Sequence, residues 1–318
     1  KRGIIAGTGI ESGSSWPPQK SPPDALGNYQ TLCQTPPMVS TLAAVTSTLA
    51  AASYLTGSML QARRYRREAG PGSEPHDLTS SQSSSRTLIT LSILGAFLHG
   101  FTNQQVIWSD GSLNLGITTS ISLVSWIMLV FVLIASFRLP LTNLLVLILP
   151  LAAAGVLLTL IPDMSASPTA SLSDPLIWHI LISIVAYSIL FMAACQSVLL
   201  AVLEHRLKAK QTLRFLRLLP PLQTMESLLF GLLWTGITAL TLAIGSGFLF
   251  LDDMFEQRVV HHTVLALASW VLYAALLTGH RLLGWRGTTA VRWTLIAFSL
   301  LLLGYFGSKF VIEVLLEG

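Results

Sequence analysis

The sequence predicts an all-α, polytopic membrane protein: a helical bundle of about eight transmembrane helices with both termini external. Three observations predict this fold class. They are eight long apolar runs, connections whose basic residues fall on alternate sides, and a low content of charge. Hydrophobic residues make up 52% and charged residues only 11% of the 318-residue chain, whereas about 25% of a soluble domain is charged. The mean hydropathy of +0.65 agrees with this prediction.

The apolar runs begin at Met38 and continue to the end of the chain. Each reaches the length of about 20 residues that a helix needs to cross the hydrocarbon core of a bilayer. In order, the runs are 38–61, 88–107, 115–137, 139–161, 176–203, 228–251, 263–283 and 291–316. The third and fourth are joined by the short turn at Arg138-Leu139-Pro140, which predicts an antiparallel pair of helices.

The connections between these runs carry their basic residues on alternate sides. Of the 19 Lys and Arg residues, 14 lie in the first, third, fifth and seventh connections: Arg63, Arg64, Arg66, Arg67, Arg86, Arg138, Arg206, Lys208, Lys210, Arg214, Arg217, Arg281, Arg286 and Arg292. The even-numbered connections hold only Arg258. The positive-inside rule therefore places the odd connections in the cytoplasm and both termini outside. The net charge of +4 then indicates membrane lipid, and not nucleic acid, as a partner.

The chain divides at Met38 into two segments of different composition. Residues 1–37 contain three proline-rich clusters, the last at Pro36-Pro37, and too little apolar surface to build a core. We expect them to be a disordered or non-native N-terminal extension, with Met38 as the natural start. Residues 38–318 are expected to form one transmembrane domain.

Two of the expected cytoplasmic connections are longer than a turn. Residues 62–87 are Arg-rich and then rich in Gly, Ser and Pro, which is typical of a flexible linker. Residues 204–227 interleave basic with apolar residues as far as Pro220-Pro221. That pattern indicates either an amphipathic helix on the inner leaflet or a solvated connector with snorkelling basic side chains. On the other face, residues 102–114 and 162–175 are expected to be short external loops.

Ionisable residues inside membrane spans are energetically expensive, so they are the first candidates for function. Five of the seven His residues lie near the ends of the expected spans: His99, His179, His261, His262 and His280. The first four gather at the external face, and His280 lies at the cytoplasmic end of the seventh span. Adjacent His261 and His262 point about 100° apart on a helix, so at most one of them faces a given site. A zinc site built from three or four converging ligands is therefore only weakly indicated.

The segment that opens the fifth span combines a His with small residues and a phenol. On a helix, His179, Ser183, Ala186 and Tyr187 share a face, and His99 also lies above small residues in the second span. Two imidazoles that face a common apolar cavity can be the axial ligands of a haem iron. An interfacial His that binds a backbone carbonyl is an alternative explanation of the same spacing.

Five short patterns follow one another in a specific order from His179 to the end of the chain. They are Trp178-His179 with Ala186-Tyr187, Leu219-Pro220-Pro221-Leu222-Gln223-Thr224-Met225-Glu226, Gly245-Ser246-Gly247, Gly279-His280 with Gly284-Trp285-Arg286-Gly287, and Tyr305-Phe306-Gly307-Ser308-Lys309. Through the order and spacing of these patterns, the chain resembles the cytochrome c assembly family, which includes the haem-handling CcsA, CcmC and HemX groups. Within that family it most resembles the inner-membrane YpjD-type branch. Residues 38–178 match the family only in hydropathy and number of spans. The resemblance implies a multi-pass protein of the bacterial inner (cytoplasmic) membrane with haem as its cofactor.

The resemblance also implies roles for individual His residues. In the haem-attaching members an external His opens the helix that corresponds to the fifth span, and His179 occupies that place. A second His lies near the cytoplasmic end of the helix before the Gly-Trp-Arg-Gly turn, and His280 is shifted from it by about two positions. With haem bound, we expect His179 to ligate the iron, with His99, His261 or His262 as the opposite ligand.

Two features of the haem-attaching members are missing. Their external tryptophan-rich WWD motif, which presents haem to an apocytochrome, should lie between Gly247 and Thr263, where this chain has Phe248-Leu249-Phe250-Leu251-Asp252-Asp253-Met254-Phe255. Their last external His should follow Tyr305-Phe306-Gly307, where this chain continues Ser308-Lys309-Phe310. The missing motif argues against haem attachment by this protein, and we expect no enzymatic activity.

The sequence therefore predicts an integral membrane protein that binds or relays haem in support of cytochrome c assembly or haem homeostasis. Its expected partners are cytochrome c maturation or haem-synthesis proteins. Two alternatives stay open. One is a transporter or ion-resistance factor whose polar residues line a path. The other is a membrane regulator of haem-synthesis enzymes that acts through residues 204–227.

Overall fold

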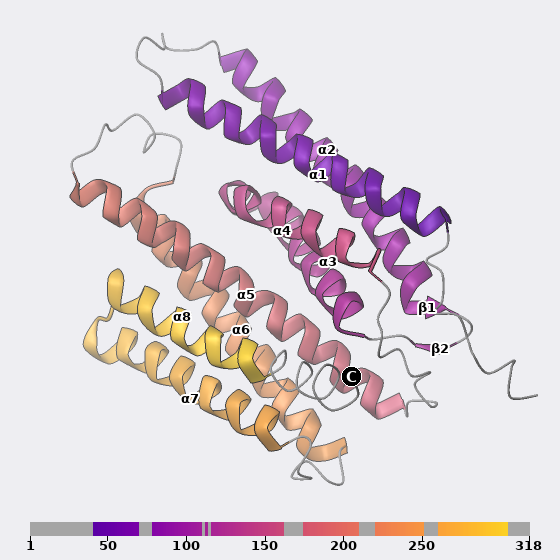
Figure 1. Cartoon of the computed structure of the whole chain (residues 1–318). Helices are drawn as coiled ribbons and strands as arrows, with labels where there is room; N and C mark the ends of the chain where they lie inside the picture. The colour runs from indigo at the N-terminus through magenta and orange to yellow at the C-terminus, as the bar shows by residue number, and fades with distance from the viewer. Residues whose placement is uncertain are drawn as a thin grey trace, which may run out of the picture. The chain divides into compact units, whose positions relative to one another are not determined.

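Helices account for almost all of the chain that the structure, a computed structural model, describes: residues 41–69, 78–109, 112–113, 116–161, 174–209, 220–250 and 260–304. Within these residues there are eight α-helices, α1 (Thr41–Ala69), α2 (Leu78–Ile107), α3 (Ile117–Ser136), α4 (Leu145–Leu158), α5 (Asp174–Lys208), α6 (Leu222–Phe250), α7 (Val260–Leu283) and α8 (Thr288–Leu302) (Figure 1). A 3-10 turn, η2 (Thr142–Leu144), precedes α4, and two antiparallel two-residue strands, β1 (Trp108–Ser109) and β2 (Ser112–Leu113), follow α2. The predicted all-helical class is confirmed.

Several helices extend beyond the apolar runs that predict them. The first expected linker, residues 62–87, is shortened from both sides, because α1 continues to Ala69 and α2 already begins at Leu78. The external loop expected at 102–114 overlaps the second apolar run, 88–107, and the structure agrees with the run, because α2 ends at Ile107. A helix satisfies its own backbone hydrogen bonds, and Arg and Gln are good helix formers, so a helix does not stop where its side chains become polar. The amphipathic helix considered for residues 204–227 falls mostly on 210–219, outside the described residues.

Four of these helices are long and apolar enough to cross a membrane. The spans are Ile117–Ser136 in α3, Pro175–Lys208 in α5, Leu222–Leu249 in α6 and His262–Leu283 in α7. Two further apolar helices, Thr142–Leu158 and Thr288–Leu302, are shorter. Because a helix rises about 1.5 Å per residue and the hydrocarbon core is about 30 Å thick, the described parts of these two helices are shorter than a full crossing. The chain is thus multi-pass.

Helix α5 connects the two halves of the described bundle. It packs most extensively against α6 and also contacts α3 and α8, while α1 packs on α2 and α4. The α5–α6 contact is close because Gly236 on α6 faces Leu190 on α5, and a Cβ at Gly236 would collide with the Leu190 side chain. The core of this pair is fully buried and apolar, with Leu190, Leu200, Leu229 and Leu233 all shielded from solvent. The packing of α5 therefore sets the position of every side chain that it carries.

The turn between α7 and α8 depends on two glycines with positive φ, 67° at Gly284 and 54° at Gly287. Only glycine adopts this region without strain. The Gly287 N–H donates to Glu226 Oε1 at 2.7 Å, so an α6 carboxylate caps the first turn of α8, where the helix dipole favours negative charge. Ser269 Oγ on α7 donates to the Ala297 carbonyl on α8 at 2.8 Å, which holds the hairpin together farther along.

Candidate functional site

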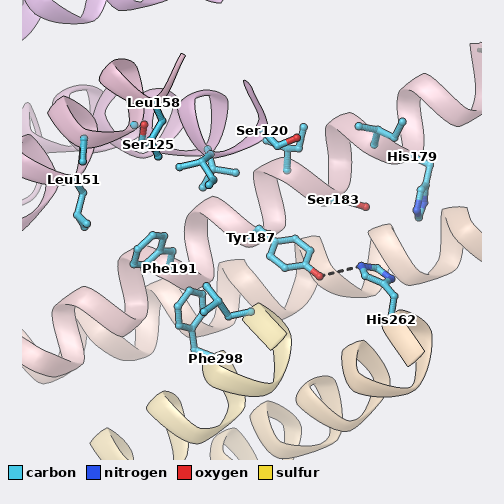
Figure 2. A pocket seen from close by; sticks show the side chains of 17 residues that line it. Ser120, Ser125, Leu151, Leu158, His179, Ser183, Tyr187, Phe191, His262 and Phe298 are labelled. Carbon is cyan, nitrogen blue, oxygen red and sulfur yellow. Dashed lines mark hydrogen bonds between the residues drawn. The ribbon is translucent and has the colours of Figure 1, made fainter. Parts of the chain in front are cut away.

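One apolar cavity, of about 390 Å³, is bounded by five helices, α3, α4, α5, α7 and α8. Its walls are mainly aliphatic and aromatic, and its polar groups are two imidazoles, a phenol and three serine hydroxyls. Figure 2 shows His179 and His262 near one end, with Phe191 and Phe298 toward the other. The volume lies within the range of about 300–1,000 Å³ that is typical of small-molecule sites, and such sites combine apolar walls with a few placed polar groups.

His179 enters this cavity from the first turns of α5, as the sequence predicts. Its Nδ1 lies 2.9 Å from Ser246 Oγ on α6. The Ser246 hydroxyl donates its single proton to the Ala243 carbonyl at 2.8 Å, so Ser246 accepts the hydrogen bond from His179 Nδ1–H. The Ala243 carbonyl is a further hydrogen-bond partner of this ring. With Nδ1 protonated, the neutral ring carries its lone pair on Nε2. An imidazole held through Nδ1–H, with Nε2 available, is the usual form of a metal-binding His.

His262 comes to the same cavity from the start of α7. Its Nε2 lies 3.2 Å from the Tyr187 hydroxyl, two turns below His179 on α5 (Figure 2). Position 261 also lies on α7, but its side chain is outside the described residues. The structure thus brings together two of the five predicted His residues, His179 and His262, and adds Tyr187 to them.

Small and aromatic side chains complete the walls. Ser183 follows His179 by one turn on α5, and Gly155 on α4 leaves room because a Cβ there would collide with Ser125 of α3. Phe191 and Phe298 stack with their ring centroids 5.0 Å apart and an interplanar angle of 24°. A flat, largely apolar ligand can lie against such walls, since stacked aromatic surfaces offer large contact areas.

His99 has a different environment, in a buried polar cluster between α1, α2 and α3. Its Nε2 is 2.9 Å from Ser122 Oγ, and Ser122 donates to Asn103 Oδ1 at 2.6 Å. Ser122 therefore accepts from His99 Nε2–H, and His99 Nδ1 accepts from the Tyr54 hydroxyl at 3.3 Å. Both ring nitrogens are engaged, and the residue does not line the cavity that contains His179. Below it, Gly95 allows Tyr54 to approach α2 closely, which is a packing role.

His280 lies at the opposite end of α7 from His262, and it is also separate from the cavity. Its Nδ1–H donates to the Trp285 carbonyl at 2.8 Å, and its ring stacks on Phe230 with centroids 3.5 Å apart. This histidine holds the α7–α8 turn against α6. The sequence leaves open, for His179 and His99, the alternative of a His that binds a backbone carbonyl. Such a bond is found at His280, and the Ala243 carbonyl is also a hydrogen-bond partner of His179.

A bare metal ion has too few ligands in this part of the molecule. No group of three or more His, Cys, Asp or Glu side chains converges among the described residues, whereas zinc sites need three or four protein ligands. A metal that arrives inside a macrocycle needs only one or two axial ligands from the protein. His179 and His262 therefore fit a metalloporphyrin better than a bare ion.

Sequence reasoning missed the partner of His179 and one side of the site. Ser246 belongs to the quoted Gly245-Ser246-Gly247 pattern, but nothing in that pattern shows that its hydroxyl points at His179. The walls from α3 and α4 were also missed, because residues 117–158 carry no motif. Ala186, expected on the His179 face, is buried and does not line the cavity, because the lining face is turned toward Ile180 and Ile184.

Comparison with known proteins places the chain in a family. The family profile described as "Cytochrome C assembly protein" matches residues 87–316. The inner membrane protein YpjD of Escherichia coli K12 is 34% identical over 133 residues, which cover 42% of this chain and 50% of YpjD. An uncharacterized 28.8 kDa protein of Azospirillum brasilense, in the nifR3-like 5' region, is 35% identical over 209 residues, 62% of this chain and 77% of that protein. No solved structure matches.

These matches confirm the predicted resemblance and the location. The chain spans about half the length of YpjD, but the profile extends the likeness upstream of His179 to residue 87, where the sequence patterns offered only hydropathy. YpjD is an inner membrane protein by name, and the four membrane-capable helices agree. The chain therefore belongs to the cytochrome c assembly protein family, on its YpjD-type branch, and is a multi-pass inner-membrane protein.

Proposed function

We propose that this protein binds haem in the membrane and hands it on or holds it in support of cytochrome c assembly or haem homeostasis, without attaching it covalently. One observation carries the proposal. An apolar cavity is lined by an imidazole, His179, whose Nδ1 is hydrogen-bonded to Ser246. Partners from cytochrome c maturation or haem synthesis belong to the same proposal.

The residues present fit the group that the family implies. A haem needs an apolar cleft for its macrocycle and one or two basic side chains for its iron, and the cavity offers aromatic and aliphatic walls with two imidazoles at one end. His179 would be the first axial ligand. His262 is the second candidate, and it would exchange its hydrogen bond to Tyr187 for the metal. When bound, haem would supply a redox-active iron, and the chain's own residues would orient it and exclude water.

The remaining predicted ligands take supporting roles in this proposal. His99, with both ring nitrogens bonded inside the α1–α2–α3 cluster, would stabilise the wall helix α3. His280 would hold the α7–α8 turn. His261 stays an alternative to its neighbour His262.

The arrangement in the membrane is also part of the proposal. We infer eight spans with both termini external, from the 14 basic residues in odd connections. Residues 38–318 would form the membrane domain, and residues 1–37 would add no folded part. Deleting 1–37 should leave membrane abundance and thermal stability unchanged, because a proline-rich segment with little apolar surface cannot offset its own ordering entropy. A large loss of either would show that the segment folds.

The test of haem binding uses purified protein reconstituted with haemin in detergent. His179→Ala should lower the haem affinity at least tenfold and shift or remove the Soret band. His205→Ala is the matched control, because His205 is an exposed histidine near the other end of the same helix. It should leave the spectrum unchanged.

Two further variants separate ligation from folding. His262→Ala should shift the Soret maximum or change the spin state of the iron while the protein stays folded. His99→Ala should lower the melting temperature, because it leaves Ser122 and Tyr54 without their partner, yet keep the Soret band of the folded fraction. A wild-type Soret band at full occupancy in His179→Ala would exclude this residue as a ligand and remove the basis of the proposal.

A further inference from the structure

A second hollow lies on the surface of α7, away from the His179 cavity. It is a shallow groove of about 520 Å³, lined along α7 from Trp270 to Leu283 and closed at one end by Trp285. Its floor is made of small residues, Ala274, Ala275 and Gly279, and its end is flanked by Leu282 and Leu283, which are 77% and 69% exposed. The groove belongs to a helix that can cross the membrane, so a lipid acyl chain can pack against its apolar walls.

The closed end of this groove is rigid. The Trp285 indole lies over Gly279, where a Cβ would collide with the ring. The Trp285 backbone N–H donates to the Gly279 carbonyl at 3.2 Å, and the Trp285 carbonyl accepts from His280 Nδ1–H at 2.8 Å. The indole is therefore held as a fixed ridge at the end of α7 and does not move freely with its side-chain torsions.

Two arginines lie next to this end of the groove along the chain. Arg286 directly follows Trp285 and is exposed, and the exposed Arg281 lies one residue before Leu282. The Arg281 Cζ lies 4.3 Å from the centroid of the Trp234 ring, a stacking contact that leaves the N–H groups of the guanidinium edge available. Neither arginine forms an ion pair with a described carboxylate. The two carboxylates beside Gly287 have other partners: Glu204 pairs with Lys208 at 3.1 Å, and Glu226 accepts the Gly287 N–H.

We propose that this groove binds an anionic phospholipid, with one acyl chain along α7 and the phosphate at Arg281 and Arg286. Charge complementarity favours a lipid over a partner helix. Two arginines that take part in no described ion pair, next to the end of an apolar groove, match a phosphodiester head group, and basic pockets beside transmembrane helices bind anionic lipids. A partner helix would instead need a carboxylate at this depth, which is expensive in a membrane.

The experiment measures lipid binding to the delipidated, purified full chain by native mass spectrometry. Dioleoyl phosphatidylglycerol and dioleoyl phosphatidylcholine are titrated in parallel, because they share acyl chains and differ in net head-group charge. The wild type should bind phosphatidylglycerol at least tenfold more tightly. Arg286→Gln and the double variant Arg281→Gln/Arg286→Gln should progressively remove this preference, and the corresponding Lys variants should restore part of it.

Two further variants separate the groove from simple surface charge. Ala275→Trp fills the floor and keeps both arginines, so it should weaken phosphatidylglycerol binding at least fivefold. Arg138→Gln is the matched control, since Arg138 is exposed at the α3–α4 turn, is expected on the same membrane side and does not line this groove. It should change nothing.

Three outcomes would overturn the proposal: equal affinities for the two lipids, an unchanged preference in the double Gln variant, or unchanged binding in Ala275→Trp. Binding of inorganic phosphate at millimolar concentration in the absence of lipid, lost in the double Gln variant, would also overturn it, because it would show an anion site that needs no acyl chain. None of these outcomes bears on haem binding, because the groove and the His179 cavity share no residue.

Discussion

At the scale of single residues, the candidate site depends on one hydrogen bond between helices. Ser246 on α6 orients the His179 ring on α5, at 2.9 Å between Oγ and Nδ1. The hydroxyl proton of Ser246 is committed to its own helix, at the Ala243 carbonyl. The serine can therefore only accept from His179, and this choice places the lone pair on the other ring nitrogen. Partners of this kind typically change metal affinity by about 10–100-fold when removed.

Ser246→Ala should accordingly weaken haem binding about tenfold or more, because the His179 ring loses both its orientation and its tautomer preference. The measurement is a haemin titration followed at the Soret maximum. Ser227→Ala is the matched control, since Ser227 lies on the same helix, is exposed and bonds only its own helix, to the Gln223 carbonyl at 3.0 Å. Equal affinities for the two variants would show that Ser246 has no part in positioning the ligand.

At the scale of helices, the site is held by the contact between α5 and α6. Helix α5 carries His179, Ser183 and Tyr187 into the cavity, while α6 provides the serine that orients the first of them. The two helices approach closely because Gly236 of α6 has no side chain at its contact with Leu190 of α5. Small residues at such crossings allow apolar helices to pack closely in a membrane.

Gly236→Ala should therefore destabilise the protein, because the added methyl group collides with Leu190 and forces the two helices apart. Overpacking of this kind costs about 1–3 kcal/mol, which should appear as a lower melting temperature of the protein in detergent. Gly231→Ala, five positions earlier on the same helix, meets nothing within 4 Å and should be neutral. If the two variants melt at the same temperature, the close α5–α6 contact does not limit stability.

At the scale of the whole molecule, charge in the connections decides which way the bundle faces. The alternation of basic residues places the ends of α1 and α5 that carry Arg64 and Lys208 in the cytoplasm. In the proposed topology, His179 and His262 would lie near the external face, where an assembly protein would meet an exported apocytochrome. Sidedness is thus part of the functional proposal.

Cysteine-accessibility labelling in intact cells tests this orientation. Single cysteines in place of Arg64, Lys208 and Arg217 should stay protected from a membrane-impermeant maleimide until the membrane is opened. Cysteines in place of Asp110, Asp174 and Glu256 should be labelled directly. External labelling at position 217 would reverse the assignment of the basic connection and put the His179 cavity on the cytoplasmic side.

The sequence by itself determined the class, the location and the family of this protein. An apolar run of membrane length predicts that a helix crosses the bilayer, and basic residues beside it predict which end is cytoplasmic. Both are local properties of the sequence, so they can be recognised without a three-dimensional structure. The ordered patterns from His179 onward were sufficient for the family, and His179 itself was identified as a candidate ligand by its place at the start of the fifth span.

Only the tertiary structure decided which histidines meet. His99 and His179 look alike in sequence, each an imidazole above small residues. The fold engages both nitrogens of His99 with Tyr54 and Ser122, but it leaves one nitrogen of His179 in the cavity. Helix ends were also misjudged from the sequence, because α1 and α2 continue through polar residues that hydropathy reads as loop. The physical reason is the same in both cases: packing partners come from distant helices, and side-chain polarity along one helix does not specify them.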